Sequence, residues 1–310
     1  MHGDMDMDGI KDPAKDLIGK YLSHLKIEKG YSLNTILSYG GDLSSFYEYL
    51  RNRNKGFGSV TSETFQEFLG YLASTGISPK TRARLYSSVK GFYKFLYRQS
   101  LIKEFPFKNI EYPFIPRKLP EFLTKDEIKK MLNADFGDNF EGVRNKALLE
   151  LLYASGLRIS EIAYIELENF NFEMNFAKVS GKGSKERIVP FGKSAKEYIF
   201  KYLAERQKLI TGNKSFLFIT RRGNPLTRQG LWKIIKKIAI ASGINKNITP
   251  HTIRHTFATH LLAGGADLRS IQQMLGHSDI STTEIYTHTD ISHLKSQHTK
   301  FHPRNRNDRE

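Results

Sequence analysis

The spacing of apolar residues divides the chain into two regions. Over the first hundred residues apolar side chains recur every three or four positions, which predicts four helices, and Ser78-Pro79 marks the start of the last one as an N-cap residue followed by proline. Prolines then interrupt the helical periodicity. We therefore predict a disordered tail at 1–9, a helical domain at 10–104, a linker at 105–121 and a second domain at 122–310.

The second region combines helices with one short stretch of strand pattern. β-rich segments at 176–179 and 187–189 flank a turn rich in glycine and lysine, which predicts a β-hairpin with Lys182 at its tip. Thr124 and Glu127 form a capping-box pattern at an earlier helix start. Helical patterns follow at 194–209, 227–242, 250–263, 267–275 and from Thr282, with a weaker one at 291–297 and a polar tail at 303–310. The predicted fold class is mainly α with a small antiparallel β-sheet.

The charge of the chain points to a polyanionic partner. Its 310 residues include 48 Lys and Arg against 32 Asp and Glu, a formal net charge of +16, and the basic excess runs through both predicted domains. This favours a large polyanion such as nucleic acid. The lack of cysteine excludes a disulfide framework, a thiolate metal site and a thiol nucleophile, and it fits a reducing cytoplasm. The sequence also shows no run of about 18 apolar residues and no basic start, so we expect neither a membrane span nor a signal peptide.

A helix start in the second domain carries candidate phosphate-binding side chains. Thr249 is an N-cap residue and proline occupies the first helical position, which places His251 and Arg254 three residues apart on one face of the first turn. A helix N-terminus presents unpaired N–H groups and the positive end of the helix dipole, so it favours an anion. Taken alone, the segment also fits a polar helix start whose His and Arg are merely solvated.

The last helix of the first domain is a candidate DNA contact. Basic residues lie beside its apolar stripe, with no acidic residue in the first three turns. This composition suits a phosphate backbone, although a charged helix face is more commonly a solvated surface. The candidates are Lys80, Thr81, Arg82, Arg84 and Lys90.

Five segments of the chain resemble the motifs of the tyrosine recombinases. They are ASGLRISE at 154–161, GKGSKER at 181–187, HTIRHTFATH at 251–260, LGH at 275–277 and YTH at 286–288. Within that family the short chain and its closing His302-Pro303-Arg304 are most similar to the Xer-type chromosome-dimer resolvases. The catalytic positions that the resemblance implies are Arg158, Lys182, His251, Arg254, His277 and Tyr286.

The resemblance implies strand transfer without a metal or other cofactor. Tyr286 would be the nucleophile and would form a 3′-phosphotyrosyl link to DNA, which stores the energy of the broken bond. Arg158 and Arg254 would clamp the phosphoryl oxygens, a task for which lysine is a poor substitute. Lys182 would protonate the departing 5′ oxygen.

Other residues would support this chemistry. His251 would assist proton transfer from the tyrosine, and His277 would hydrogen-bond the phosphate. Glu161 would orient the site rather than titrate during the reaction. Lys185 and Arg187, close to the hairpin tip, would contact DNA.

The family also implies an architecture and partners. A four-helix core-binding domain and a catalytic domain would form a C-shaped clamp on double-stranded DNA that carries an inverted-repeat recombination site. Four subunits would act together, as a homotetramer or as a heterotetramer with a related recombinase, and the segment after Ile291 would dock on a neighbouring subunit. A DNA translocase is a candidate activator. The implied role is resolution of chromosome or plasmid dimers at the nucleoid. No membrane is expected as a partner.

Other interpretations fit parts of the pattern. His251 and His255 have the spacing of metalloprotease ligands, but no glutamate follows His251, and Arg254 would repel a metal ion. A DNA-binding regulator without catalytic activity would explain the charge but not a nucleophile such as Tyr286. An integrase of a mobile element and a type IB topoisomerase share the implied chemistry and stay as alternatives.

Overall fold

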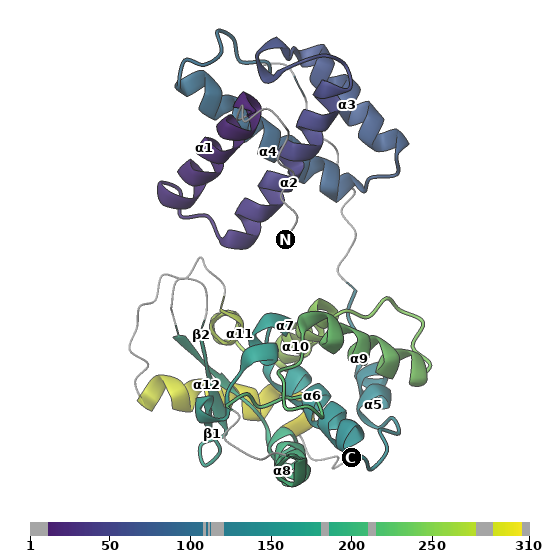
Figure 1. The fold of residues 1–310 in the computed structure, drawn as a ribbon. Coiled ribbons are helices and arrows are strands. Elements are labelled where there is room, and N and C mark those ends of the chain that lie inside the picture. The colour runs from purple at the N-terminus through teal and green to yellow at the C-terminus, as the bar shows by residue number, and fades with distance from the viewer. Residues whose placement is uncertain are drawn as a thin grey trace. The chain divides into compact units, whose positions relative to one another are not determined.

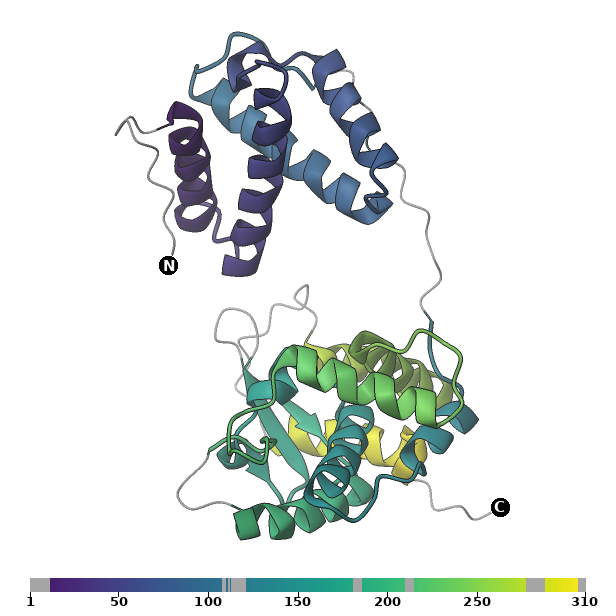
Figure 2. The same ribbon diagram turned by 45° about the vertical axis from the view of Figure 1, so that its right-hand side comes forward.

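Two units make up the fold, Met1–Lys118 and Leu119–Glu310 (Figures 1 and 2). The computed structural model describes residues 12–107, 110, 112, 121–180, 186–209, 215–276 and 288–305. Within these ranges helices predominate and a three-stranded antiparallel sheet lies in the second unit, which confirms the predicted fold class. In the same ranges, no helix is long and apolar enough to cross a membrane.

Four helices enclose an aromatic core in the N-terminal unit. They are α1 (Pro13–Ile27), α2 (Leu33–Arg51), α3 (Ser62–Ser74) and α4 (Pro79–Arg98), with a short 3₁₀ helix, η1 (Phe57–Ser59), after α2. Each α-helix begins at a side-chain cap, and α1 and α4 carry proline in the first turn. Phe46, Phe65 and Phe68 are fully buried, with ring centroids 4.8 to 6.1 Å apart, and form the centre of the core.

The first residues of the predicted linker pack onto this unit. Phe107 and Ile110 are buried in its core. The Ser62 hydroxyl donates to the Pro106 carbonyl at 2.6 Å, and the Tyr86 hydroxyl donates to the Ile110 carbonyl at 2.9 Å. Residues 105–107, 110 and 112 lie in no helix or strand, as the prolines predicted, and the burial of Phe107 and Ile110 removes apolar surface from water, which stabilises this packing.

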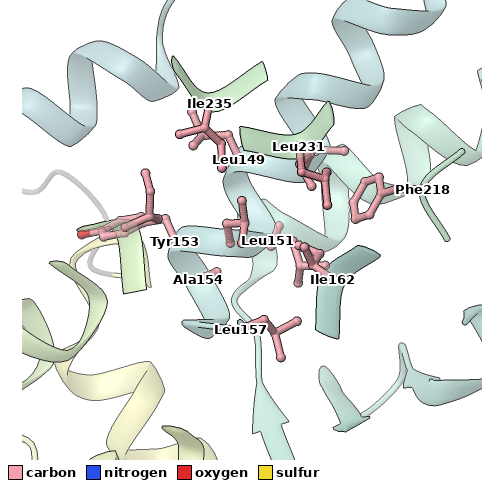
Figure 3. Packing of buried hydrophobic residues seen from close by; sticks show 14 of the residues in the cluster. Leu149, Leu151, Tyr153, Ala154, Leu157, Ile162, Phe218, Leu231 and Ile235 are labelled. Atoms are coloured by element: carbon pink, nitrogen blue, oxygen red, sulfur yellow. The ribbon is translucent and has the colours of Figure 1, made fainter. Parts of the chain in front are cut away.

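In the C-terminal unit, α6 (Phe140–Ser155) forms the centre of the core. Around it lie α5 (Lys125–Leu132), α7 (Ile159–Tyr164), η2 (Leu167–Asn169), α8 (Lys193–Leu209), α9 (Arg228–Ala241), α10 (Pro250–Gly264) and α11 (Leu268–Leu275). Leu149 and Leu151 of α6 share one buried cluster with Ile162 of α7 and Leu231 of α9 (Figure 3). Every residue of α6 from 147 to 155 is buried, because α5, α8 and α10 all pack against this helix. The predicted capping box at the start of α5 is confirmed.

The predicted hairpin is confirmed and gains a third strand. β2 (Phe176–Ser180) and β3 (Glu186–Pro190) pair antiparallel, and β1 (Phe170–Asn171) pairs with the other edge of β2. Both α11 and the C-terminal helix pack against β3. The hairpin tip at 181–185 lies outside the described residues.

The C-terminal helix packs against its own chain. α12 (His288–Phe301) extends beyond the weak helical pattern at 291–297, and η3 (Pro303–Asn305) follows it. Arg304 forms a two-point ion pair with the fully buried carboxylate of Glu150, at 2.6 and 3.1 Å. The segment that we expected to dock on a neighbouring subunit thus covers its own unit in this structure. The predicted polar tail is wrong for residues 303–305, because they form η3 and the buried Glu150 binds the side chain of Arg304.

Two buried histidines anchor α12 to the end of α6. His298 Nε2 lies 2.6 Å from the Ala154 carbonyl oxygen, and His302 Nε2 lies 3.1 Å from that of Tyr153. These contacts satisfy carbonyl groups that a helix end leaves unpaired. Burial lowers the pKa of His298 from 6.5 to about 4, and burial together with the neighbouring His298 lowers the pKa of His302 well below 6.5. Both imidazoles are therefore neutral in the folded protein at neutral pH.

Acidification is expected to lower the free energy of unfolding through these histidines. As pH falls from 6.5 toward 4, the unfolded chain takes up protons that the folded chain does not, so stability drops by up to about 1.4 kcal/mol per pH unit for each histidine. Denaturant unfolding between pH 7 and pH 5 measures this slope. His298→Gln should remove one histidine's share of this slope. An identical slope in the wild type and His298→Gln would contradict the assignment.

Candidate active site

The turn between α6 and α7 places Arg158. Gly156 ends α6 in a left-handed conformation (φ 59°), and a Cβ there would lie 2.4 Å from the ring of Phe257, so both backbone and packing require glycine. Leu157 is fully buried and anchors the turn in the core (Figure 3). Arg158 is then the N-cap residue of α7, and its backbone N–H donates to Glu161 Oε2 at 2.7 Å. Its side chain remains 37% exposed and can meet a ligand.

The start of α10 brings Arg254 to the same place. Thr249 caps this helix and proline occupies its first turn, as predicted. Arg254 donates from Nη1 to the Gly156 carbonyl at 2.8 Å and from Nη2 to the Leu275 carbonyl. Burial, followed by the positive charge of Arg158, lowers the pKa of Arg254 to about 10, so it is protonated at neutral pH. The two guanidinium groups repel each other, and a bound anion would relieve that repulsion.

The last carbonyl groups of α11 bind arginines from three different segments. A helix leaves its final carbonyls without intrahelical partners, and they carry the negative end of its dipole, so cations are favourable there. These contacts fix the backbone directly before His277. The carbonyls of Met274, Leu275 and Gly276 accept from Arg187 Nε (2.8 Å), Arg254 Nη2 and Arg158 Nη2 (2.9 Å), respectively.

Glu161 joins Arg158 to Arg187 through a buried carboxylate. Its Oε1 accepts from Nη1 of both arginines at 2.9 Å, and its Oε2 accepts from Nη2 of Arg187 at 2.7 Å. Burial acts to raise the pKa of Glu161, but the hydrogen bonds and charges of Arg187 and Arg158 together bring it below its usual value. The group is therefore ionised and holds Arg158 in place through its Oε1.

The expectation that Arg187 contacts DNA is corrected by the structure. The residue is 5% exposed, and its three nitrogen atoms donate to Met274 and Glu161. DNA contact was expected because Arg187 is close to the hairpin tip in sequence. Beyond Glu186, however, β3 is buried and packs against α11, so Arg187 points into the unit.

The remaining predicted catalytic residues are only partly described. His251 is exposed in the first turn of α10, three residues before Arg254. Four predicted residues lie outside the described ranges: Lys182, Lys185, His277 and Tyr286.

The predicted DNA contacts on α4 divide into exposed and packed side chains. Lys80 and Arg84 are exposed. Thr81 hydrogen-bonds the N-cap serine through its backbone N–H (3.2 Å) and hydroxyl (2.9 Å), and Lys90 donates to a tyrosine hydroxyl at 3.1 Å. Arg82 is half-buried. Lys80 and Arg84 are thus the members of this set that present charge most openly.

A buried acid, which we did not predict, orients Arg84. Asp42 of α2 is 4% exposed, accepts from Arg84 Nη2 at 2.8 Å and from the Ser88 hydroxyl at 3.2 Å. Burial raises the pKa of Asp42, and the charge of Arg84 opposes that shift. An acidic residue inside an apolar helical stripe is the sequence signal that points to such a pair.

A basic face on α9 was also missed. Its exposed residues include four cations, and the helix contains no acidic residue. Lys236 lies over the half-exposed ring of Trp232, with its Nζ 5.2 Å from the ring centroid. The charge pattern of 228–241 could have revealed this face. The cations are Arg228, Lys233, Lys236 and Lys237.

Both units match known protein families. Residues 121–293 match the phage integrase family, and residues 18–100 match the N-terminal SAM-like domain of phage integrases. Tyrosine recombinase XerD of Oceanobacillus iheyensis is 44% identical over 292 residues, which cover 93% of this chain and 98% of that protein. Tyrosine recombinase XerD of Staphylococcus epidermidis is 43% identical over 291 residues, which cover 93% of this chain and 99% of that protein.

Solved structures share the fold. The XerH site-specific recombinase bound to a palindromic difH substrate aligns with a TM-score of 0.73 and 23% identity, over 94% of this chain and 98% of that chain. The Tn1549 transposon integrase in complex with circular intermediate DNA aligns with a TM-score of 0.70 and 21% identity, over 90% of this chain and 97% of that chain. The matching families, the relatives and the motifs around Arg158 and Arg254 lead to one conclusion: the chain belongs to the phage integrase family and is a Xer-type tyrosine recombinase.

Proposed function

We propose that this protein is a site-specific DNA recombinase that cuts and rejoins DNA through a 3′-phosphotyrosyl intermediate and resolves chromosome or plasmid dimers. The observation that carries the proposal is the convergence of Arg158 and Arg254 on the end of α11. Each of these arginines uses some of its five N–H donors on protein carbonyls or on Glu161, and among the described residues its other donors are available to a ligand. Paired guanidinium groups with fixed positions match the oxygens of a phosphodiester.

The proposed reaction balances without an added cofactor. The Tyr286 hydroxyl loses its proton, with help from His251, and its oxygen forms a bond to the scissile phosphorus. The bond from phosphorus to the 5′ oxygen breaks, and Lys182 gives a proton to that oxygen. Arg158 and Arg254, together with His277, stabilise the charge on the non-bridging oxygens in the transition state. The reverse steps, with the 5′ hydroxyl of another strand as nucleophile, reseal the DNA.

We further propose that the exposed cations of α4 and α9 contact the DNA backbone. Lys80→Ala is expected to weaken binding about equally on all DNA sequences and to reduce the slope of log K against log salt concentration by about 0.9. The reason is that one phosphate contact, and the counterion release that accompanies it, is lost. A binding titration at several salt concentrations measures both quantities.

A matched control for this experiment is Lys208→Ala. Lys208 is an exposed lysine of α8 that is paired with Glu205. The Lys208→Ala variant should keep the wild-type affinity for DNA and the wild-type slope of log K against log salt concentration. An unchanged slope in Lys80→Ala would remove this part of α4 from the proposed interface.

The proposed assembly is a tetramer on two double-stranded DNA sites that carry inverted repeats, at the nucleoid. It contains four copies of this chain, or copies of this chain and of a related recombinase. A DNA translocase is a proposed activator. The family membership and the XerD relatives support this assignment. The integrase of a mobile element is the second candidate, because the Tn1549 integrase shares the fold.

An excision assay in the host cell tests the function. DNA bound by the protein is recovered by immunoprecipitation, and two direct copies of the recovered site are placed on a plasmid. We expect the cell to excise the interval, and to stop doing so when the gene encodes Arg158→Ala. Recovery of one chromosomal site supports dimer resolution, and recovery of mobile-element ends supports the integrase. Excision that continues with Arg158→Ala would contradict the proposal, as would relaxation of plasmids without the site.

A further inference from the structure

Arg187 is a buried arginine that ties together three segments far apart in the sequence. From β3 it binds both carboxylate oxygens of Glu161, at 2.9 and 2.7 Å, and it donates from Nε to the Met274 carbonyl at 2.8 Å. Its Cδ also lies against Gly276, where an added Cβ would come within 2.8 Å and where φ is +66°. One side chain therefore contacts the Arg158 turn, the hairpin and the backbone directly before His277.

We propose that Arg187 is a positioning residue that keeps Arg158 available to the scissile phosphate, an inference that rests on the proposed function. Glu161 Oε1 is shared between Arg158 and Arg187, so Arg187 supplies part of the counter-charge that the buried carboxylate requires. Without it, Glu161 would have Arg158 as its remaining cationic partner among the described contacts. The acid would then draw the Arg158 guanidinium toward itself and weaken its pull on a phosphate.

Geometry as well as charge is required of this residue. The planar guanidinium meets Glu161 with two parallel hydrogen bonds while Nε reaches a carbonyl in another direction. A lysine supplies one point charge and cannot make the three contacts together. The inference also accounts for Gly276, because any larger residue would push against the stem of Arg187.

The hairpin gains a defined position from the same contacts. Arg187 pairs with Val179 across the β2–β3 ladder and lies two residues after the end of the tip segment that contains Lys182. Fixing Arg187 to Glu161 and Met274 thus fixes the base of that hairpin relative to Arg158.

The test compares cleavage of two DNA substrates by Arg187→Gln and Arg187→Lys. Each substrate is a nicked site, with either a normal phosphodiester or a neutral methylphosphonate at the scissile position, and covalent adduct is measured in a single turnover. On the phosphodiester both variants should be slower by on the order of 10- to 100-fold, below the 10²- to 10³-fold typical of losing a direct oxyanion donor. The methylphosphonate carries less negative charge for the arginines to stabilise. On this substrate the difference in cleavage rate between each variant and the wild type should therefore shrink, as it should for Arg158→Ala.

Arg144→Gln is the matched control for a purely structural effect. Arg144 is also buried (6% exposed) and donates to a carbonyl of the same unit, that of Ile219, but none of its described hydrogen bonds involves a residue of the site. Any loss of cleavage rate that it causes should be equal on both substrates.

Glu161→Gln combined with Arg187→Gln should raise the activation free energy of cleavage by less than the sum of the two single changes, because the acid that Arg187 neutralises is then gone.

The outcomes separate this inference from the proposed function. If the wild type forms no adduct, the proposed function itself fails. If the wild type forms adduct and Arg187→Gln cleaves at the same rate, or is slowed equally on both substrates, the positioning role is overturned. Thermal unfolding and DNA binding of each variant show whether it folds. If Arg187→Gln does not fold, the test is the ratio of the cleavage rates of Arg187→Lys on the phosphodiester and the methylphosphonate.

Discussion

Arg254→Ala is expected to slow strand cleavage by on the order of 10³ to 10⁵, the range seen when a phosphoryl-transfer site loses its arginine. Arg254 binds the Gly156 and Leu275 carbonyls, so it is held in one orientation before DNA arrives. A charge fixed in this way stabilises the transition state without reorganisation. The rate of adduct formation on a nicked site in a single turnover measures the loss, and affinity for the intact site should change little.

Two comparisons show whether geometry matters at this position. Arg254→Lys should recover little of the rate, because lysine cannot donate to two carbonyls and a phosphate in one plane. Arg269→Ala, at an exposed arginine of α11, should cleave at the wild-type rate. A lysine variant that cleaves nearly as fast as wild type would show that a positive charge alone is sufficient.

Tyr286→Phe is expected to abolish the covalent adduct completely. Phenylalanine has no oxygen to attack the phosphate, and no other step of the proposed reaction can replace that bond. DNA binding should persist, because the ring and the basic faces of α4 and α9 remain. Denaturing electrophoresis of the protein–DNA mixture detects the adduct.

Tyr164→Phe is the control for this change. Tyr164 ends α7 close to Arg158 in sequence and is 54% exposed, so it is an accessible tyrosine of the same unit. Its variant should form adduct normally. An adduct that persists in Tyr286→Phe and disappears in Tyr164→Phe would show that the nucleophile is Tyr164 rather than Tyr286.

Local signals predicted much of the fold. The Thr249-Pro250 start, the capping box of α5 and the hairpin are each decided by a few neighbouring residues, and each is confirmed. The clustering of Arg158 and Arg254 did not follow from spacing, because they lie in different helices. It came from the resemblance to the tyrosine recombinases.

What the sequence could not predict depends on burial of polar groups. Arg187, Asp42 and Glu150 are charged residues, a class that is mostly exposed, yet each is buried against a partner from a distant segment. The same holds for His298 and His302, whose partners are the carbonyls that end α6. Periodicity reports which positions are apolar, whereas the pairing of buried charges is decided by contacts between distant elements.

The central claim is that a tyrosine of this chain breaks DNA without a metal. The most direct test incubates the wild type and Tyr286→Phe with nicked DNA of the recovered site in EDTA, followed by denaturing electrophoresis and mapping of the linked tyrosine. We predict a covalent adduct through a 3′ phosphate at Tyr286 with the wild type and none with the variant. Adduct that forms only after a divalent metal is added, or that forms equally with Tyr286→Phe, would contradict the account.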